Sequence, residues 1–412
     1  MPDEVLTCAA PAGEAASAAS LDAATVQTRL AALLGNEVER RMMTPQDDLI
    51  GHQTSTSFAH VASSDPAWME RLWYTGHPVP GGDMIFDIGL GFHPNRNVMD
   101  GFAGITIGTE QYNFRASRRA WPNPLETTIG PLHIEVLEGF RRHRLRLEEN
   151  ESPLTFDLEF LGTMNPHEEE PHFRRRNGRV TEDMARLQQL GAYSGWIRLG
   201  DREITVDPAQ WLGQRDHSWG IRGEMRTDES DPPITFYPPF LYAWTTAQFK
   251  DRGLHLFFKE RAPGDTIYIS GEEVMPMGAK PLRGRKFVSV GHDFDFVDDP
   301  LGLTVRGAQW DVRFSDGSER RISIRTLPAR YFLKGGLYGG LNGWKHGDDK
   351  GALHKEHDQW NLELPDIRTL VRSLADHVIE VRDGDEVGYG IMECGIGSGY
   401  PLYPQVQHHP AI

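Results

Sequence analysis

From about residue 54 onward, apolar and polar side chains alternate with a period of two, which is the pattern of half-buried β-strands. One such segment alternates Ile85, Asp87 and Gly89 with Phe86, Ile88 and Leu90. Residues 154–160 repeat the pattern with leucine and phenylalanine. Clusters of glycine and proline interrupt the strands at Pro78–Gly82, His93–Asn97 and Pro122–Pro124, where the backbone must turn. The spacing predicts a meander of antiparallel strands.

The second half of the chain has the same character, and we expect further strands at 240–249, 254–260, 286–296, 303–314 and 320–326. Asp316-Gly317 and Asp383-Gly384 indicate tight hairpins, because both residue types tolerate positive φ angles. The sequence contains 43 glycines and 27 prolines, and this composition favours barrels or sandwiches over helix-linked parallel sheets. We therefore predict an all-β fold with two antiparallel barrel or sandwich domains.

A few short helices are expected around these sheets. Apolar residues at helical spacing predict helices over 22–36, over 181–190 and from Asp366 onward. Residues 1–20 carry few large apolar side chains and are predicted to form a disordered tail. We place the two β domains at 21–200 and 201–412.

Charge and cysteine content exclude several classes of function. The net charge of the 412 residues is −16, which disfavours nonspecific binding to nucleic acid or to an anionic membrane. Only two cysteines occur, so a disulfide framework is not expected. The N-terminus has no basic and apolar segments typical of a secretory signal, and no stretch is long and apolar enough to span a membrane. These features predict a cytoplasmic protein, and they leave its oligomeric state open.

The densest group of reactive side chains lies between Gly213 and Arg222. It reads Gly-Gln-Arg-Asp-His-Ser-Trp-Gly-Ile-Arg and contains Arg215, Asp216, His217, Ser218, Trp219 and Arg222. An acid, an imidazole and an indole in one segment could handle protons and stabilise positive charge in one pocket. Residue types alone equally allow a structural ion pair of Arg215 with Asp216 and a core tryptophan, because ion-pair networks also gather polar groups.

The Arg-Asp-His-Ser-Trp-Gly core resembles the carotenoid hydratase (hydroxyneurosporene synthase) and AttH-like superfamily. Residues 191–195 upstream, and Gly388-Tyr389-Gly390 and Glu393 downstream, add to the resemblance, which extends over about residues 55–400. It implies two lipocalin-like β domains, with the motif in the second.

The resemblance also implies chemistry that needs no cofactor. Asp216 would protonate a carbon–carbon double bond, His217 would relay the proton, Trp219 would face the developing cation, and Arg215 would complete the catalytic group. Such a lyase or isomerase would be a hydratase, dehydratase or cyclase for a hydrophobic terpenoid-like or steroid-like substrate. Burial in an apolar barrel would raise the pKa of Asp216, whereas a paired Arg215 would lower it.

Strands after the motif supply candidate substrate-binding residues. Tyr242 and Trp244 share one strand face with Phe240, and His255 shares a face with Phe257. Arg222 and Glu393 complete the set of substrate-binding candidates, and a proline-rich loop, 231–239, could form a rim. An ordinary aromatic core face is the alternative for each aromatic residue.

Two histidine-containing segments have the atoms of metal ligands. His167-Glu-Glu-Glu-Pro-His172 and His354-Lys-Glu-His357 are both expected to be solvated loops, so no metal site is predicted.

Two other functions remain open from the sequence. An aromatic-lined β cavity could carry a lipid unchanged, since fold alone does not decide function. A tryptophan-rich β surface could also bind or process glycans, although hydrolysis would need two carboxylates across a cleft.

Overall fold

The computed structural model describes residues 45–48, 50, 55, 57, 58, 60–176, 178–223, 239–301, 303–372 and 374–406. The chain divides into two compact units, 1–62 and 63–412. In the first unit, the 3-10 turn η1 (Pro45–Asp48) places Asp47 so that its carboxylate accepts a hydrogen bond of 2.8 Å from the Phe58 amide. The tail expected at 1–20 and the helix expected at 22–36 lie outside the described residues.

The second unit contains a large antiparallel sheet of 14 strands that curls into a half-barrel. Eleven strands run in the order β20-β4-β3-β2-β1-β13-β11-β8-β7-β6-β5, and β9, β10 and β12 pair only with β11. The bounds are β1 Trp68–Pro78, β2 Met84–His93, β3 Val98–Ile107, β4 Glu110–Arg119, β5 Thr128–Ile129, β6 Leu132–Glu138, β7 Arg142–Leu147, β8 Leu154–Gly162, β9 His167–Glu168, β10 His172–Arg176, β11 Arg179–Leu199, β12 Arg202–Val206, β13 Trp211–Ile221 and β20 His354–Asn361.

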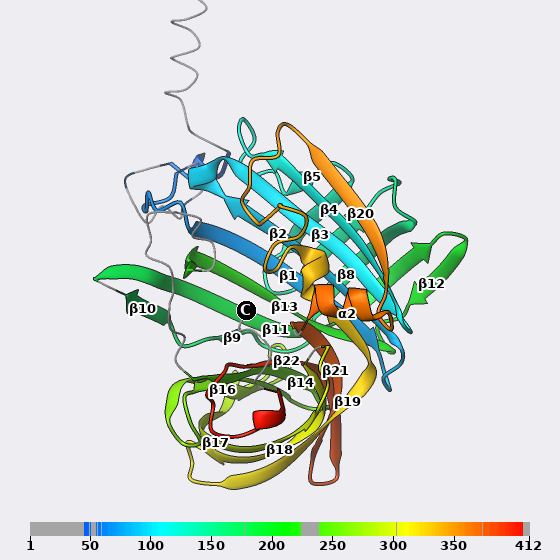
Figure 1. Cartoon of the computed structure of the whole chain (residues 1–412). Helices are drawn as coiled ribbons and strands as arrows, with labels where there is room; N and C mark the ends of the chain where they lie inside the picture. The colour runs from blue at the N-terminus through cyan, green and yellow to red at the C-terminus, as the bar shows by residue number, and fades with distance from the viewer. Residues whose placement is uncertain are drawn as a thin grey trace, which may run out of the picture. The chain divides into compact units, whose positions relative to one another are not determined.

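The remaining strands close into an antiparallel barrel, in the order β14-β15-β16-β17-β18-β19-β21-β22 (Figure 1). Their bounds are β14 Leu241–Gln248, β15 Gly253–Glu260, β16 Thr266–Val274, β17 Arg283–Val297, β18 Thr304–Phe314, β19 Glu319–Phe332, β21 Ala375–Asp383 and β22 Glu386–Ile396. The all-β prediction is confirmed. Gly317 and Gly384 have the positive φ angles, 84° and 61°, that the predicted hairpins require.

Helical segments are short. The structure has α2 (Pro365–Val371) and the 3-10 turns η2 (Pro94–Arg96), η4 (Leu333–Gly336) and η5 (Pro404–Val406). The helix predicted from Asp366 is therefore confirmed, although it ends at Val371. Among the described residues, no helix is both long and apolar enough to cross a membrane.

The helix predicted over 181–190 is wrong, because these residues belong to the 21-residue strand β11. The segment is rich in residues that favour helices, but it lies in a strand that pairs with β13 and β12 along one edge and with β8, β9 and β10 along the other. Long pairing along both edges outweighs a local propensity of a few tenths of a kcal/mol per residue.

The change from sheet to barrel falls between Ile221 and Leu241, not at the expected boundary near residue 200. The motif strand β13 lies within the large sheet, paired with β1 and β11. Strand β20, from the second half of the sequence, also joins this sheet by pairing with β4. No local pattern predicts this pairing, because it joins residues about 240 positions apart.

Both β layers have well-packed apolar cores. One face of the large sheet buries a cluster that includes Leu72, Tyr74 and Phe160. The barrel interior is occupied by a second cluster, which includes Phe258 and Trp310. The described barrel interior also holds the buried pair of His292 and Glu260, which lie 2.6 Å apart.

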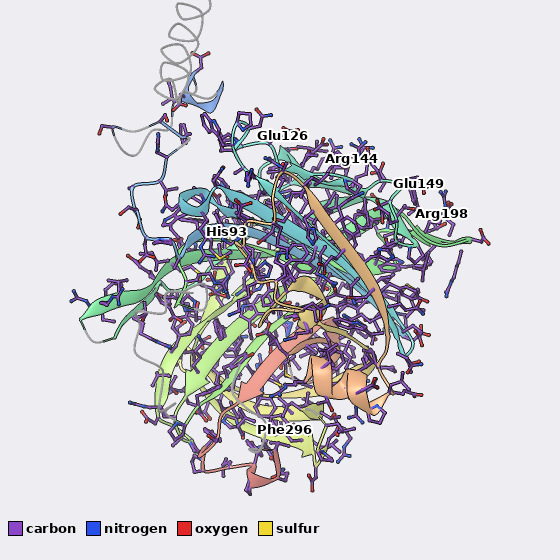
Figure 2. All side chains as sticks on the ribbon, turned by 45° about the horizontal axis from the view of Figure 1, so that its top comes forward. His93, Glu126, Arg144, Glu149, Arg198 and Phe296 are labelled. Carbon is purple, nitrogen blue, oxygen red and sulfur yellow. The ribbon has the colours of Figure 1, made fainter. Side chains whose placement is uncertain are left out.

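Charged pairs lie at the edge of the large sheet remote from the barrel. Arg144 on β7 and Arg198 on β11 appear at that edge in Figure 2, whereas Phe296 marks the barrel. Arg144 pairs with Asp157 at 2.6 Å and Arg198 with Glu203 at 2.9 Å, and all four are partly exposed. Exposed pairs of this kind contribute little to stability.

Candidate active site between the sheet and the barrel

The second face of the large sheet packs on the outer wall of the barrel, and we call this contact the interlayer. Trp73 and Phe102 come from the sheet, and Trp244, Phe257 and Tyr331 come from the barrel. In Figure 1, β11 and β13 run beside the barrel strands β14 and β22. The rings of Trp73 and Trp244 meet edge to face, with centroids 5.6 Å apart.

Strand β13 sends alternate side chains to its two faces. Asp216 is directly opposite Trp73 on β1, and cross-strand partners share a face, so Asp216 and Ser218 face the interlayer. Arg215, His217 and Trp219 face the other way. The sequence suggested that Asp216 and His217 could act in one pocket. In the structure they lie on opposite faces of β13 and do not share a pocket wall.

The three side chains on the opposite face each have structural surroundings. Arg215 donates hydrogen bonds of 3.0 and 2.8 Å to the Gln189 side chain and lies over the Phe160 ring in the sheet core. His217 pairs with Glu70 at 2.7 Å, where both are partly exposed. The Trp219 side chain is 40% exposed and contacts the His217 ring.

Asp216 is buried, and burial raises the pKa of its carboxyl group. The charges of Arg186 and Arg222 oppose this shift, and the Arg186 Nε lies 3.5 Å from Asp216 Oδ2. The other oxygen, Oδ1, has no hydrogen-bond partner among the described residues. An acid with a raised pKa and an uncommitted oxygen can exchange a proton with a ligand.

Glu169 connects the sheet to the barrel. Its carboxylate accepts hydrogen bonds from Trp244 Nε1 at 2.9 Å, from His172 Nε2 at 2.8 Å and from the Gln188 amide, and Arg186 lies 3.4 Å away. Although burial opposes ionisation, Arg186 and His172 hold the pKa of Glu169 below its usual value. The 167–172 segment is therefore not the solvated loop expected from the sequence, because His167, Glu169 and His172 are buried while Glu168, Glu170 and Pro171 are exposed.

Of the other residues predicted from the sequence, four lie on the barrel wall and one, Arg222, lies just after β13. Tyr242, Trp244, His255 and Glu393 come from the barrel wall on the interlayer side. The Tyr242 hydroxyl donates to Glu393 at 2.9 Å, and His255 Nδ1 contacts Gln188 Oε1 at 2.8 Å. Burial lowers the pKa of His255 well below its usual value, so this imidazole is neutral at pH 7. Arg222 follows β13, where its backbone amide bonds to Ala67 O at 3.1 Å.

Two further carboxyl groups, Asp87 on β2 and Asp376 on β21, meet in the interlayer. Asp87 pairs across the sheet with Gly104, and a Cβ on Gly104 would lie 2.3 Å from the Tyr331 hydroxyl. Tyr331 is in turn the cross-strand partner of Asp376. The two side chains thus enter the interlayer from opposite layers, and a side-chain hydrogen bond between them shifts the pKa of each.

The surroundings of this pair favour the protonated form. Burial raises the pKa of Asp87 to about 7, against the opposing effects of Asp376 and Thr75, and the charge of Glu393 adds to the rise. Burial, followed by the charges of Asp87 and Glu393, raises the pKa of Asp376 well above its usual value. Neither carboxyl forms an ion pair among the described residues.

Sequence reasoning missed Asp87, Asp376, Arg71, Arg186 and Glu169. Asp87 had been placed on the polar side of an alternating strand, but every residue of β2 is buried. A single carboxylate in a strand that is buried on both faces would have marked Asp87 as a candidate site residue. Nothing local in the sequence indicates that Asp376 lies opposite it.

Several polar atoms of the interlayer remain uncommitted. Both terminal nitrogens of Arg71 and the Ser218 hydroxyl are buried without a hydrogen-bond partner among the described residues, while the Arg71 guanidinium lies over the Tyr338 ring at 4.7 Å. Such groups are costly to bury, and functional sites are where native proteins keep them. The described part of the chain has no group of three or more His, Cys, Asp or Glu side chains arranged to hold a metal ion. The 354–357 segment forms strand β20 rather than the expected loop.

Comparisons with known proteins identify the fold. An AttH-like protein of Nitrosomonas europaea has a similar structure, with a TM-score of 0.50 and 14% identity over 79% of this chain and 92% of that one. Kievitone hydratase from Nectria haematococca matches with a TM-score of 0.35 and 9% identity over 79% of this chain and 88% of that one. No curated protein matches by sequence. One family model covers residues 43–401, and its description states that the function is unknown.

Proposed function

The chain belongs to the family of unknown function DUF8625, and we propose that it is a cofactor-independent enzyme that adds water to, removes water from, or isomerises a hydrophobic substrate by acid–base catalysis in the interlayer. The substrate class is a terpenoid-like or steroid-like molecule. The protein would thus belong functionally with the hydratases that its sequence motif resembles.

The observation that carries this proposal is the position of Asp216. It is a buried carboxyl group with a raised pKa, and it lies directly across from Trp73, whose ring meets that of Trp244. When this carboxyl group carries a proton, its position on the sheet face of Trp73 suits protonation of an alkene, because the indole face attracts the resulting cation by about 2 kcal/mol or more when desolvated.

The roles follow from which side chains share a face. Asp216 would donate the proton to carbon, and Trp73 and Trp244 would stabilise the cation. Tyr242, Glu393 and His255 would line the barrel side and orient the substrate. Glu169 would hold Trp244 and Arg186 in place through its hydrogen bonds and ion pair. Arg215, His217 and Trp219 have no direct role in this scheme, since they lie on the opposite face of β13.

Product analysis tests the proposal. Purified protein is incubated with a panel of terpenoid, steroid and polyketide compounds, and the recovered molecules are examined by mass spectrometry. We expect gain or loss of one water, or a product of equal mass and new retention, and we expect it to disappear in Asp216→Asn. Asp311→Asn is the matched control, because Asp311 is exposed on the barrel and paired with Arg321.

A carrier function predicts the opposite result. A ligand that binds and is recovered unaltered, with similar affinity in Asp216→Asn, would favour the carrier. Binding of sugars and not of apolar compounds would favour the glycan alternative.

A further inference from the structure

We propose that Asp87 is the general base of the interlayer site, and that Asp376 is a positioning residue that holds the proton shared by the two carboxyl groups. This inference rests on the proposed function, and it assigns the second acid–base group that such a reaction needs.

The first argument is stereochemical. Asp87 projects from the large sheet and Asp376 from the barrel. Gly104, the cross-strand partner of Asp87, packs against Tyr331, which is the cross-strand partner of Asp376. An ionised carboxylate only accepts hydrogen bonds, so two carboxyl groups in contact can bond to each other only when one is protonated. The arrangement is therefore stable with one shared proton and unstable with none.

The second argument concerns the charges that face the pair from the packed elements. Glu393 on β22 adds negative charge around Asp376, and Asp216 on β13 adds more when it has given up its proton. The nearby hydroxyls of Thr75, Tyr331 and Tyr242 are neutral, since burial raises the pKa of both tyrosines. Two cations of the interlayer lie against other groups, Arg186 beside Glu169 and Asp216 and Arg71 over the Tyr338 ring, and no ion pair with Asp87 or Asp376 forms among the described residues. Arg115 on β4 pairs with Asp358 at 2.6 Å.

The third argument assigns the proton within the pair. The pKa of Asp376 is raised well above its usual value, whereas that of Asp87 is raised to about 7. Near neutral pH, Asp376 therefore keeps its proton and donates it in a hydrogen bond to the Asp87 carboxylate. A carboxylate with a pKa near the working pH is well matched to removing a proton from water.

The reaction balances with these groups alone. Asp216 gives its proton to one carbon of the double bond, and the π electrons form the new C–H bond. Water adds to the cationic carbon, and Asp87 takes the proton that this water loses. The proton then returns from Asp87 to Asp216 through solvent, so that alkene and water give an alcohol. Dehydration follows the same steps in reverse.

Two readouts test the inference. Infrared difference spectroscopy of wild type against Asp376→Asn, at about pH 8, should show one C=O band of a buried protonated carboxyl that the wild type has and the variant lacks, because a band of Asp216 is common to both proteins and cancels. Turnover should fall at least about 100-fold in Asp87→Asn, because an amide cannot accept the proton. Asp376→Asn should retain turnover within about tenfold, because its neutral amide still donates to Asp87, whereas Asp376→Leu should lose as much as Asp87→Asn. Circular dichroism confirms that each variant is folded.

Several outcomes overturn the inference. Absence of the infrared band would show that Asp376 does not hold a proton. Unimpaired turnover in Asp87→Asn would show that Asp87 is not the general base. Equal losses in Asp87→Asn and Asp376→Asn would contradict the assignment of Asp87 as base and Asp376 as positioning residue. A wild type that binds but never converts any compound would fail the proposed function itself, and the carboxyl pair would then be structural.

Discussion

Trp73 from the sheet and Trp244 from the barrel meet edge to face, with ring planes 77° apart, at the position where Asp216 projects from β13. Replacing Trp73 with leucine should lower kcat/KM about 30-fold, because about 2 kcal/mol of cation stabilisation is lost. Steady-state kinetics on a substrate that the wild type converts measures the effect.

The matched control is Trp219→Leu. Trp219 lies on the opposite face of the neighbouring strand and is 40% exposed, so its loss should leave kcat/KM within about twofold. His217→Gln should behave in the same way, because its partner is Glu70 rather than any group in the interlayer. A large loss in either variant would show that the two faces of β13 are assigned incorrectly.

Stability should depend on pH through Asp87. Its pKa is raised from 3.8 to about 7 on folding, so the folded protein binds a proton that the unfolded chain releases. The stabilisation that Asp87 contributes is therefore fully present below about pH 4. It is lost as the pH rises toward 7 and remains absent at higher pH. Asp87→Asn removes the cost of ionising this buried carboxyl group, so it should raise the free energy of unfolding at about pH 8 by a few kcal/mol.

Thermal unfolding of wild type and Asp87→Asn at about pH 4 and pH 8 measures this effect. The two proteins should match at the lower pH, and the variant should have the higher Tm at the upper pH. A variant that is less stable than wild type at pH 8 would mean that the Asp87 carboxylate is stabilised in the fold.

Glu169 should stabilise the fold strongly. Glu169→Gln removes the carboxylate that holds Arg186 near the Trp244 indole and His172, and it should cost about 3–5 kcal/mol in urea unfolding. Its sequence neighbour Glu170 is exposed and pairs with Lys286 at 3.1 Å, so Glu170→Gln should cost no more than about 1 kcal/mol. Equal costs would contradict the buried network.

Gly104 should be needed for the two layers to approach. A Cβ at this position would lie 2.3 Å from the Tyr331 hydroxyl, so Gly104→Ala should destabilise the protein by about 1–3 kcal/mol. A Cβ on Gly139 would meet nothing within 4 Å, and Gly139→Ala is the control. A neutral Gly104→Ala would show that the layers separate easily.

The local pattern of the sequence predicted much of the fold. Period-two alternation and Asp-Gly turns indicated the barrel strands β14, β15, β17, β18 and β19, since both signals depend on neighbouring residues. Residues 181–190 of β11 were mistaken for a helix because the strands that pair with β11, such as β8 and β13, lie elsewhere in the sequence. The motif was located, but its side chains divide between two faces, which its clustering in the sequence conceals.

The interlayer itself could be predicted only in part. Tyr242, Trp244 and His255 were found because aromatic and imidazole side chains at spacing two mark one strand face. Asp87 and Asp376 were missed because their significance depends on contact between layers, which no periodicity encodes.

Transfer of a solvent proton to carbon tests the central claim most directly. The wild type is given the alkene of its reaction in D₂O, as the substrate for hydration or isomerisation, and the product is examined for deuterium bonded to carbon. We predict one deuterium per turnover in the wild type and in Asp311→Asn, and none in Asp216→Asn. A product without carbon-bound deuterium, or equal incorporation by Asp216→Asn, would contradict acid catalysis by Asp216 in the interlayer.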